Sequence, residues 1–258
     1  MENFVISLKS ASDRRAHIKD QFGNKNIPFQ FFDAIEPSQI ESQAEQIGFE
    51  IRRTDLSRNE LACLLSHVSL WKKVVDEKIP AIAIFEDDIY LGENAELLLK
   101  DLSWLSVDIV KIEKISNTAI LDLASLDIFD DEKFSLKKML KPHLGAGGYI
   151  ISQKAAIDLL DFLGRLIVLD HVDQILFNKY IYSGRLPIFQ LNPVLCIQDC
   201  ILNPDNQKFK TSLQWRNKNK VNYTLFDKII RELRRVVRKI FEYRYKTKLL
   251  FVLKKNDL

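Results

Sequence analysis

The sequence has few cysteines and no hydrophobic run that approaches the length of a membrane span. Its three cysteines, Cys63, Cys196 and Cys200, are odd in number and lack C-x-x-C spacing, which argues against a disulfide framework and against a zinc knuckle. We expect them to be reduced residues of the core. The N-terminus carries an early negative charge and only five weakly apolar residues, so no signal peptide is indicated. These absences predict a cytoplasmic protein.

Internal repeats and low-complexity segments are also missing, but the charge is distributed unevenly. A chain of 258 residues that is 47% hydrophobic and 28% charged is long enough for one large α/β domain or two small ones. Residues 208–258 carry 16 Lys and Arg against four Asp and Glu, whereas residues 1–207 carry 22 against 31. An acidic body followed by a basic tail predicts two functional regions, and the turn formers of residues 203–207 place the boundary there.

The most informative stretch is a short apolar run that ends at three carboxylates. Ala81 to Phe85 is continuous, apolar and preceded by proline, which predicts a strand covered on both faces of a sheet. Glu86, Asp87 and Asp88 follow directly, at the end of the strand where α/β sheets bind ligands. Adjacent carboxylates repel one another unless a cation compensates, and Mg²⁺ or Mn²⁺ binds carboxylates together with substrate phosphates. We therefore favour a metal–phosphate site over a solvated acidic turn.

The N-terminal residues predict a strand, a helix and a second strand. The strand covers Phe4 to Leu8, the helix is capped by Ser10 or Ser12 and runs through Phe22, and the second strand covers Phe29 to Asp33. Arg14 and Arg15 in the helix could bind a nucleotide diphosphate, although surface arginines are more often solvated. Asp33 is equally suited to a ribose and to a turn.

A long amphipathic helix follows a polar stretch that includes a helix around residues 38–47. Ser57 and Glu60 form a capping box, and apolar residues recur at three- and four-residue intervals through about Asp76. On spacing alone, Ser66 and His67 in its middle are packed core residues.

Further along, the pattern predicts helices and strands around a glycine-rich segment. Gly145, Gly147 and Gly148 let the backbone approach a ligand closely, without the spacing of a known phosphate loop. Asp170 and Asp173 precede a helix, where a carboxylate is as suited to capping as to catalysis. The remaining predictions are a helix at 93–104, a strand at 108–112, loops or a short β excursion at 116–139, a strand at 149–151, a helix at 153–163 capped by Ser152, a helix at 174–182, and strands at 187–191 and 194–198.

Several of these motifs together resemble glycosyltransferase family 25, the bacterial lipooligosaccharide galactosyltransferases and their glucosyl relatives. The most specific motif is the helix with Glu60, Cys63, Ser66, His67 and Trp71, followed 15 residues later by the carboxylates that begin at Glu86. Residues 4–15, 145–152 and 172–173 add to the resemblance, which covers about residues 1–205. Asn59 and Ala62 depart from the pattern, because glycine is expected at both positions.

The resemblance implies an α/β, GT-A-like single catalytic domain at 1–205, with a Rossmann-like nucleotide-binding half and a mixed central sheet. It implies an inverting, metal-dependent hexosyltransferase that uses UDP-galactose, or alternatively UDP-glucose, and acts on a sugar hydroxyl of a lipooligosaccharide core. Glu86 and Asp88 would bind Mn²⁺ or Mg²⁺, and Asp173, with Asp170 second, would be the base. The residues assigned to donor binding are Ser7, Leu8, Arg14, Arg15, Asp33, Ala34, Glu60, Ser66, His67, Asp87, Gly147 and Gly148.

The tail, residues 206–258, has an amphipathic pattern of its own. Apolar residues recur at helical spacing between Leu225 and Phe241 and basic residues occupy the other face, while aromatic and apolar residues continue to Val252. This pattern is typical of a helix in an anionic membrane interface, and the alternative is a helix that packs on protein. We expect a peripheral location on the cytoplasmic face of the inner membrane. Nucleic acid is not an expected partner, because the body is acidic.

Two other functional classes stay open at this stage. A metal-dependent nucleotidyltransferase would also use clustered carboxylates, but it needs further converging acids. A non-catalytic membrane-surface module would account for the basic tail and leave every upstream motif unexplained.

Overall fold

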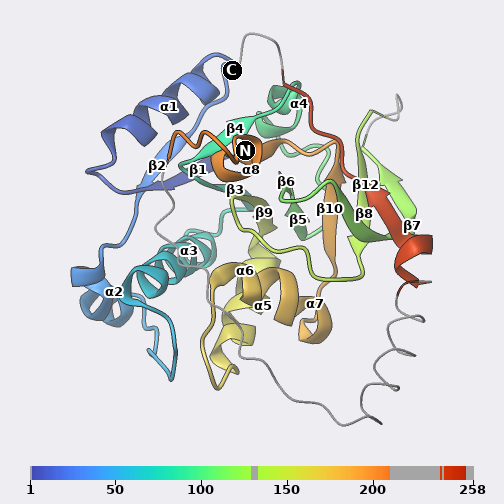
Figure 1. Cartoon of the computed structure of the whole chain (residues 1–258). Coiled ribbons are helices and arrows are strands. Elements are labelled where there is room, and N and C mark those ends of the chain that lie inside the picture. Colours follow the sequence, from blue (N-terminus) through green and yellow to red (C-terminus); the bar gives the residue numbers. More distant parts are fainter. Residues whose placement is uncertain (1, 129–132, 210–238, 240, 254–258) are drawn as a thin grey trace.

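The computed structural model describes residues 2–128, 133–209, 239 and 241–253. They form an α/β structure with a nine-stranded mixed sheet, in the order β12-β7-β8-β10-β5-β9-β3-β1-β2, and a three-stranded sheet, β4-β11-β6 (Figure 1). The strands are β1 (Glu2–Ser7), β2 (Gln30–Asp33), β3 (Ala81–Glu86), β4 (Ile89–Leu91), β5 (Ile109–Lys111), β6 (Glu113–Lys114), β7 (Thr118–Asp127), β8 (Ser135–Met139), β9 (Gly148–Ser152), β10 (Ile188–Asn192), β11 (Cys196–Gln198) and β12 (Lys246–Lys248).

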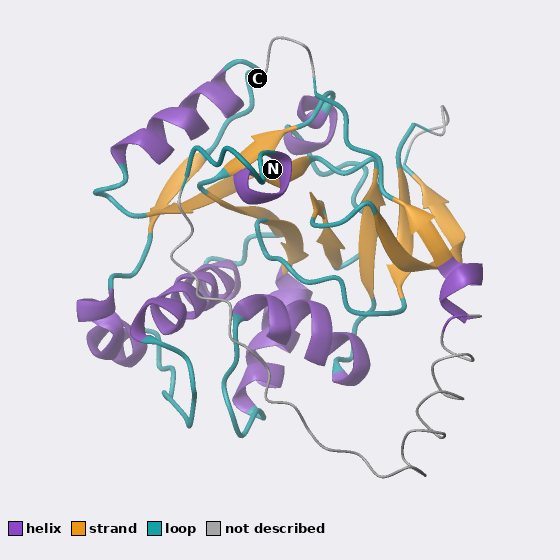
Figure 2. Ribbon diagram, viewed as in Figure 1, coloured by secondary structure: helices purple, strands orange, loops and turns teal. Residues whose placement is uncertain are grey.

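Helices cover both faces of the large sheet (Figure 2). They are α1 (Ser12–Gly23), α2 (Ile40–Gln46), α3 (Arg58–Asp76), α4 (Ala95–Leu99), α5 (Gln153–Gly164), α6 (Val172–Gln174), α7 (Tyr180–Ser183) and α8 (Asp199–Leu202), with a 3-10 turn at Pro37–Gln39 and a π-helical turn at Ile175–Lys179.

Strand β3 is an interior strand that contributes to two separate cores. Because side chains alternate along a strand, Ile82 and Ile84 face one side of the sheet, whereas Ala83 and Phe85 face the other. The first pair packs in the cluster that includes α3 and α5, and the second pair packs in the cluster that includes α1 and α4. Ala81 to Phe85 are all buried, which confirms the prediction of a strand covered on both faces.

The N-terminal half has the predicted Rossmann-like arrangement. Strand β1 lies between β2 and β3 and is parallel to both, and it pairs Ser7 with Asp33 and Ile6 with Glu86. Its neighbour on the other side of β3 is β9, which runs antiparallel, so the sheet is mixed. The carboxyl ends of β1, β2 and β3 therefore meet at one edge, and the residues that follow them are neighbours in space.

Two helix caps are confirmed and one is wrong. The Ser57 hydroxyl and the Glu60 carboxylate form the reciprocal capping box of α3. Ser152 caps α5 by accepting a hydrogen bond from the Ala155 N–H. In contrast, α1 begins after Ala11 and has no side-chain cap, because its first turn is held by backbone contacts.

Three predicted segments differ in extent or kind. The helix expected at 93–104 covers only Ala95–Leu99. The one expected at 174–182 is divided by the π-helical turn between α6 and α7. Within residues 116–139, expected as loops or a short β excursion, β7 and β8 form a long antiparallel pair, whose irregular register between Leu121 and Ser125 conceals its period in the sequence.

The last described residues of the expected tail belong to the body. Strand β12 pairs antiparallel with β7, Leu249 is buried, and the Val194 N–H donates to the Leu250 carbonyl. The expectation that residues 246–252 continue a membrane-facing pattern is therefore wrong, because they complete a sheet edge. Most of the helix expected between Leu225 and Phe241 lies outside the described residues. Within the described residues, every helix is too short or too polar to cross a membrane.

Candidate active site

The three predicted carboxylates lie at the sheet edge where the parallel strands end. Glu86 is the last residue of β3, and Asp87 and Asp88 form the turn into β4. Glu86 lies beside the end of β1, where Ser7 in turn pairs with Asp33 of β2. Three of the predicted site residues, Ser7, Asp33 and Glu86, are thus brought together by strand register alone.

Two arginines of α1 connect these strand ends. Arg14 Nη1 lies 2.6 Å from Asp87 Oδ1 and 3.6 Å from Asp88 Oδ2. Arg15 Nη2 lies 2.6 Å from Asp33 Oδ1 and also donates to the Ser7 carbonyl, while its Nε donates to the Leu8 carbonyl. The pKa of Asp33 is lowered, chiefly by this hydrogen bond from Arg15. The two arginines of α1 therefore lie against the carboxylates at the ends of β2 and β3.

Arg14 does not neutralise all of the negative charge of Glu86, Asp87 and Asp88. Burial and the charges of neighbouring carboxylates raise the pKa of Glu86 well above its usual range, and burial raises that of Asp88 to about 6. The side-chain amide of Gln198, from β11, donates to Glu86 Oε2 over 2.6 Å and lies 3.3 Å from Asp88 Oδ1. Carboxylates that are buried close together in this way are suited to bind a hard divalent cation, because the cation stabilises their ionised forms. Glu86 and Asp88 are the residues that would hold it.

His67 approaches the same cluster from helix α3. Its Nδ1 lies 2.8 Å from the Tyr149 hydroxyl, and the Trp71 indole N–H donates to that same hydroxyl over 2.9 Å. Since the indole can only donate, the phenol is free to donate its own proton to His67 Nδ1. In that tautomer the hydrogen of His67 is on Nε2, which lies 4.0 Å from Glu86 Oε1. Burial lowers the pKa of His67 to about 3, so the ring is neutral.

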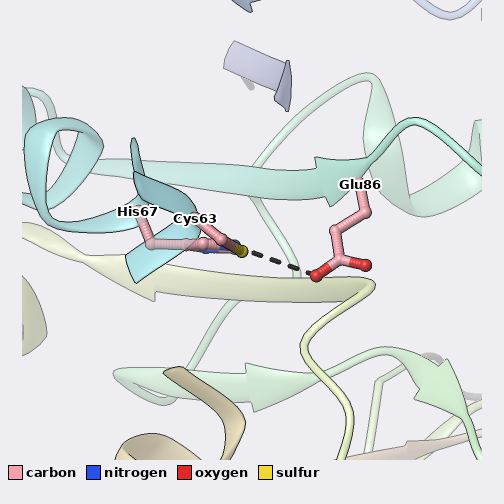
Figure 3. Close-up of side chains that lie close together, drawn as sticks. All are labelled: Cys63, His67 and Glu86. Atoms are coloured by element: carbon pink, nitrogen blue, oxygen red, sulfur yellow. Dashed lines mark ion pairs between the residues drawn. The ribbon is translucent and has the colours of Figure 1, made fainter. Parts of the chain in front are cut away.

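Cys63 lies one turn before His67 and faces the same carboxylate (Figure 3). One ligand atom from each of Cys63, His67 and Glu86 lies within 4.8 Å of the others. Burial raises the pKa of the Cys63 thiol, so it is protonated near neutral pH. A neutral thiol and a neutral imidazole are softer ligands than the carboxylates of residues 86–88, which are the better match for Mn²⁺ or Mg²⁺.

The glycine-rich segment lies against the carboxylates through its backbone. The Glu86 N–H donates to the Gly147 carbonyl over 3.2 Å. A Cβ on Gly147 would lie 2.7 Å from Glu113 Oε1, and one on Gly148 would lie 2.3 Å from Cys196 Sγ. The close approach therefore requires glycine at both positions. The Gly147 N–H donates to Glu113 Oε2 over 3.0 Å.

A buried ion pair between Lys111 and Glu113 contacts the glycine segment through hydrogen bonds to its backbone. Lys111 Nζ lies 3.0 Å from Glu113 Oε2, both side chains are fully buried, and Lys111 also donates to the Gly145 carbonyl. Neither residue was predicted as part of the site. Lys111 and Glu113 are two residues apart and therefore face the same side of their strand segments, but the sequence does not show which side is covered.

Asp173 meets the other end of the glycine segment. Its Oδ2 accepts a hydrogen bond from the Gly145 N–H over 3.1 Å, and its Oδ1 accepts from the Gln174 N–H over 2.7 Å. Its charge also contributes, after burial and nearer carboxylates, to the raised pKa of Glu86. Asp170 points elsewhere, because it pairs with Lys179 over 2.9 Å. Of the two predicted candidates for the base, Asp173 contacts the glycine segment and Asp170 pairs with Lys179.

Three residues assigned to donor binding make contacts that hold the fold together. Glu60 accepts from the Ser57 N–H over 2.7 Å and lies 3.6 Å from His171 Nε2. The Ser66 hydroxyl is fully buried, donates to the Ala62 carbonyl and accepts from the Ile35 N–H over 2.9 Å. Ala34 donates through its backbone to the Ser7 carbonyl. These contacts position α3 against the loop after β2.

Comparison with known proteins identifies the family to which the chain belongs. A family model described as "Glycosyltransferase family 25 (LPS biosynthesis protein)" matches residues 1–176. The chain belongs to glycosyltransferase family 25. This family 25 member is therefore a transferase enzyme, and the resemblance inferred from its motifs is confirmed.

Relatives of the family 25 chain include curated proteins of Neisseria and Haemophilus. It is 41% identical to "Lacto-N-neotetraose biosynthesis glycosyltransferase LgtB" of Neisseria meningitidis over 210 residues, which cover 77% of this chain and 75% of that protein. It is 33% identical to "Lipooligosaccharide biosynthesis protein lic2B" of Haemophilus influenzae over 258 residues, covering 93% and 96%. A "Putative glycosyltransferase" of H. influenzae is 36% identical over 246 residues, covering 93% and 86%.

Among solved structures, a glycosyltransferase involved in glycosylation of the major capsid of PBCV-1 aligns with 77% of this chain and 92% of its own. The TM-score is 0.42 and the identity is 7%. At this level of similarity, the alignment adds nothing to the family assignment.

Proposed function

We propose that this chain is a metal-dependent, inverting hexosyltransferase that moves galactose from UDP-galactose onto a sugar hydroxyl of a lipooligosaccharide core, with UDP-glucose as the alternative donor. The observation that carries the proposal is the meeting of three elements at one sheet edge: the Glu86–Asp88 carboxylates, the α1 arginines, and the glycine segment with Asp173. The acceptor class rests on the names of the relatives.

The donor would bind across the ends of β1, β2 and β3. Arg14 and Arg15 would contact the nucleotide, and Asp33 would accept hydrogen bonds from ribose hydroxyls. A bound Mn²⁺ or Mg²⁺ offsets the negative charge of the departing nucleoside diphosphate. The glycine segment contacts Glu86 at one end and Asp173 at the other, so the donor sugar would lie beside it.

Inversion requires one carboxylate base on the acceptor side. Asp173 would remove the proton of the acceptor hydroxyl as that oxygen forms its bond to the anomeric carbon. The bond between that carbon and the diphosphate oxygen breaks, and the nucleoside diphosphate leaves with the electron pair. His67, neutral and hydrogen-bonded to Tyr149, has its Nε2 4.0 Å from Glu86 Oε1, which is beyond hydrogen-bond distance.

The decisive experiment is donor hydrolysis. The protein is incubated with Mn²⁺ and a panel of sugar nucleotides, and release of nucleoside diphosphate is measured without acceptor. Release from one sugar nucleotide supports the proposal and identifies the sugar. Release of pyrophosphate would instead indicate a nucleotidyltransferase, and no release from any donor would favour a non-catalytic module. Asp76→Asn, an exposed acid of α3 that pairs with Lys72, is the matched control and should release product at the wild-type rate.

We also propose that the basic tail binds the anionic surface of the inner membrane, where a glycolipid acceptor is assembled. The proposal rests on sequence alone, since Arg231, Arg234, Arg235 and Arg238 lie outside the described residues. Each basic residue near such a surface contributes about 1 kcal/mol. Replacing these four arginines by glutamine should abolish co-sedimentation with phosphatidylglycerol-containing vesicles.

The control for the tail replaces four exposed lysines of the body, Lys19, Lys78, Lys100 and Lys138, by glutamine. This variant should still pellet with the vesicles. Equal loss in both variants, or retention in both, would remove the tail from membrane binding. Truncation after Asn219, the simpler design, is unsuitable because it also deletes β12.

A further inference from the structure

A cavity of about 710 Å³ lies beyond the Asp173 end of the glycine segment and contains none of the carboxylates of the candidate site. It is bordered by β7, by the segment that joins β8 to β9, by α7 and by residues around the start of β12. Its volume falls within the range of ligand-binding pockets. The cavity is thus a second concave surface, and the proposed donor site leaves it unused.

The walls of the cavity are positively charged. Lys141, Lys239 and Lys246 line it together with a single acid, Glu242. None of the three lysines forms an ion pair with any carboxylate in the described part of the chain. His143, also in the wall, is neutral because burial lowers its pKa to about 3. These ammonium groups therefore have no carboxylate partner within the described residues and can contact an anionic ligand.

Aromatic rings accompany the lysines. Tyr182 and Tyr243 line the cavity and expose 58% and 88% of their surface. Lys141 Nζ lies 6.0 Å from the centre of the Tyr182 ring and 5.8 Å from that of Phe241. An exposed tyrosine presents a flat apolar face with a polar tip, which suits a ligand with C–H faces and hydroxyl edges. A saccharide has both.

The cavity is linked to the proposed base by a short run of chain. His143 lies in the cavity wall, and two residues later the Gly145 N–H holds Asp173. The burial and hydrogen bonds of this run fix the cavity relative to the carboxylate that would deprotonate the acceptor. In Figure 1 the segment between β8 and β9 crosses in front of the sheet from β8 toward β9.

We propose that this cavity binds an acidic sugar of the acceptor, one that carries a phosphate or carboxylate group, while the acceptor hydroxyl lies at Asp173. The inference rests on the proposed function and adds a substrate class to it. Lys141, Lys239 and Lys246 would contact the anion, and the tyrosine rings would stack on the saccharide.

The test compares acceptors that differ only in charge. Probes are a neutral lactoside and the same lactoside extended by a phosphorylated or a carboxylated sugar, and transfer is measured with saturating donor and Mn²⁺. For Lys141→Gln/Lys246→Gln, we expect the KM of both acidic probes to rise about tenfold or more, since hydrogen bonds to charged groups are lost. The KM of the neutral lactoside and donor hydrolysis without acceptor should stay unchanged. Lys19→Gln/Lys78→Gln, on the exposed body surface, is the matched control and should behave as wild type.

A second pair of variants separates stacking from charge. Tyr182→Ala should raise the KM of each extended acceptor, whereas Tyr182→Phe, which keeps the ring, should not. Misfolding of the Tyr182 variants is not expected, because this side chain is largely exposed. Donor hydrolysis by each variant shows whether its donor site is intact.

Three results would overturn the inference. In the first, the double lysine variant affects neutral and acidic probes equally. In the second, it behaves as the control does. In the third, it loses binding to phosphatidylglycerol vesicles but keeps its KM for soluble acidic probes, which would assign the lysines to a lipid surface. In all three, donor hydrolysis persists, so failure of this inference is distinguishable from failure of the proposed function, in which no donor is hydrolysed.

Discussion

The backbone N–H of Gly145 donates a hydrogen bond to Oδ2 of Asp173 over 3.1 Å. Gly145 has φ of +89°, and a Cβ there would lie 2.4 Å from the Ile115 side chain. Both facts require glycine, because residues with side chains rarely adopt this conformation. The position of the proposed base is therefore set by backbone geometry, and the glycine segment connects it to Glu86 through the Gly147 carbonyl.

Asp173→Asn should lower kcat by about a hundredfold or more while donor affinity stays close to wild type. The amide keeps the size of the carboxylate and an oxygen for the Gly145 N–H, but it cannot take the acceptor proton. Steady-state kinetics and donor titration measure the two effects separately. Asp170→Asn is the control: because Asp170 pairs with Lys179, its kcat should change only a few-fold. Wild-type turnover in Asp173→Asn would remove this residue from the mechanism.

Asp88→Ala should abolish transfer, and excess chelator should do the same to the wild-type protein. Glu86 and Asp88 are the carboxylates whose burial and mutual repulsion a divalent cation would relieve. Transfer is measured with and without chelator, and Mn²⁺ is then added back. Full activity of the wild-type protein in excess chelator would leave residues 86–88 as an acidic turn stabilised by Arg14.

Lys111→Met should lower the free energy of unfolding by about 3–5 kcal/mol, because it leaves the Glu113 carboxyl buried without its partner. Burial already raises the pKa of Glu113, so part of this cost is avoided by protonation. Denaturant unfolding of Lys111→Met, Glu113→Gln and the double variant forms a cycle. We expect the double variant to be less destabilised than the sum of the two single variants, and simple additivity would show that the pair is not coupled.

The pH dependence of stability should carry a contribution from His143. Burial, and next the charge of Lys111, lower its pKa from 6.5 to about 3 in the folded state. As the pH falls below 6.5, His143 therefore becomes protonated in the unfolded chain but stays neutral in the folded protein until the pH approaches 3. The resulting stability is present above pH 6.5 and is lost as the pH falls toward 3, by at most about 3 kcal/mol between pH 7 and 4.

The measurement for His143 is a difference between two proteins. His143→Gln lacks this titration, so its unfolding free energy should fall less than that of wild type between pH 7 and 4. Asp88, whose raised pKa acts in the opposite direction, is present in both proteins and cancels. Parallel pH profiles for the two proteins would show that His143 does not titrate in this way.

The sequence predicts the parts of the site that follow regular patterns. The strand before Glu86 is an unbroken apolar run, and the capping box of α3 is a local signal, so both were found. Once β1, β2 and β3 are known to be parallel, the meeting of Ser7, Asp33 and Glu86 follows from register. Pattern and topology together thus account for the part of the site where we propose that the nucleotide binds.

The parts that were missed depend on contacts between distant segments. Gln198 reaches Glu86 from 112 positions further along the chain, and no local pattern marks it. Strand β12 joins β7 across more than 100 residues, and its Lys-Thr-Lys sequence gives no apolar alternation. Motif membership suggests donor contacts for Glu60 and Ser66, and this stays a prediction; the structure adds that Glu60 caps a helix and that Ser66 holds a loop.

The central claim is that Glu86, Asp88 and Asp173 form the site of a metal-dependent, inverting transfer. Proton NMR of the wild-type reaction tests it most directly, with UDP-galactose, a lactoside acceptor and Mn²⁺, followed through the anomeric signals of donor and product. The account predicts that the α-linked donor is converted to a β-linked product, only while Mn²⁺ is present. A product with the α configuration of the donor, or a product formed equally well in excess chelator, would contradict it.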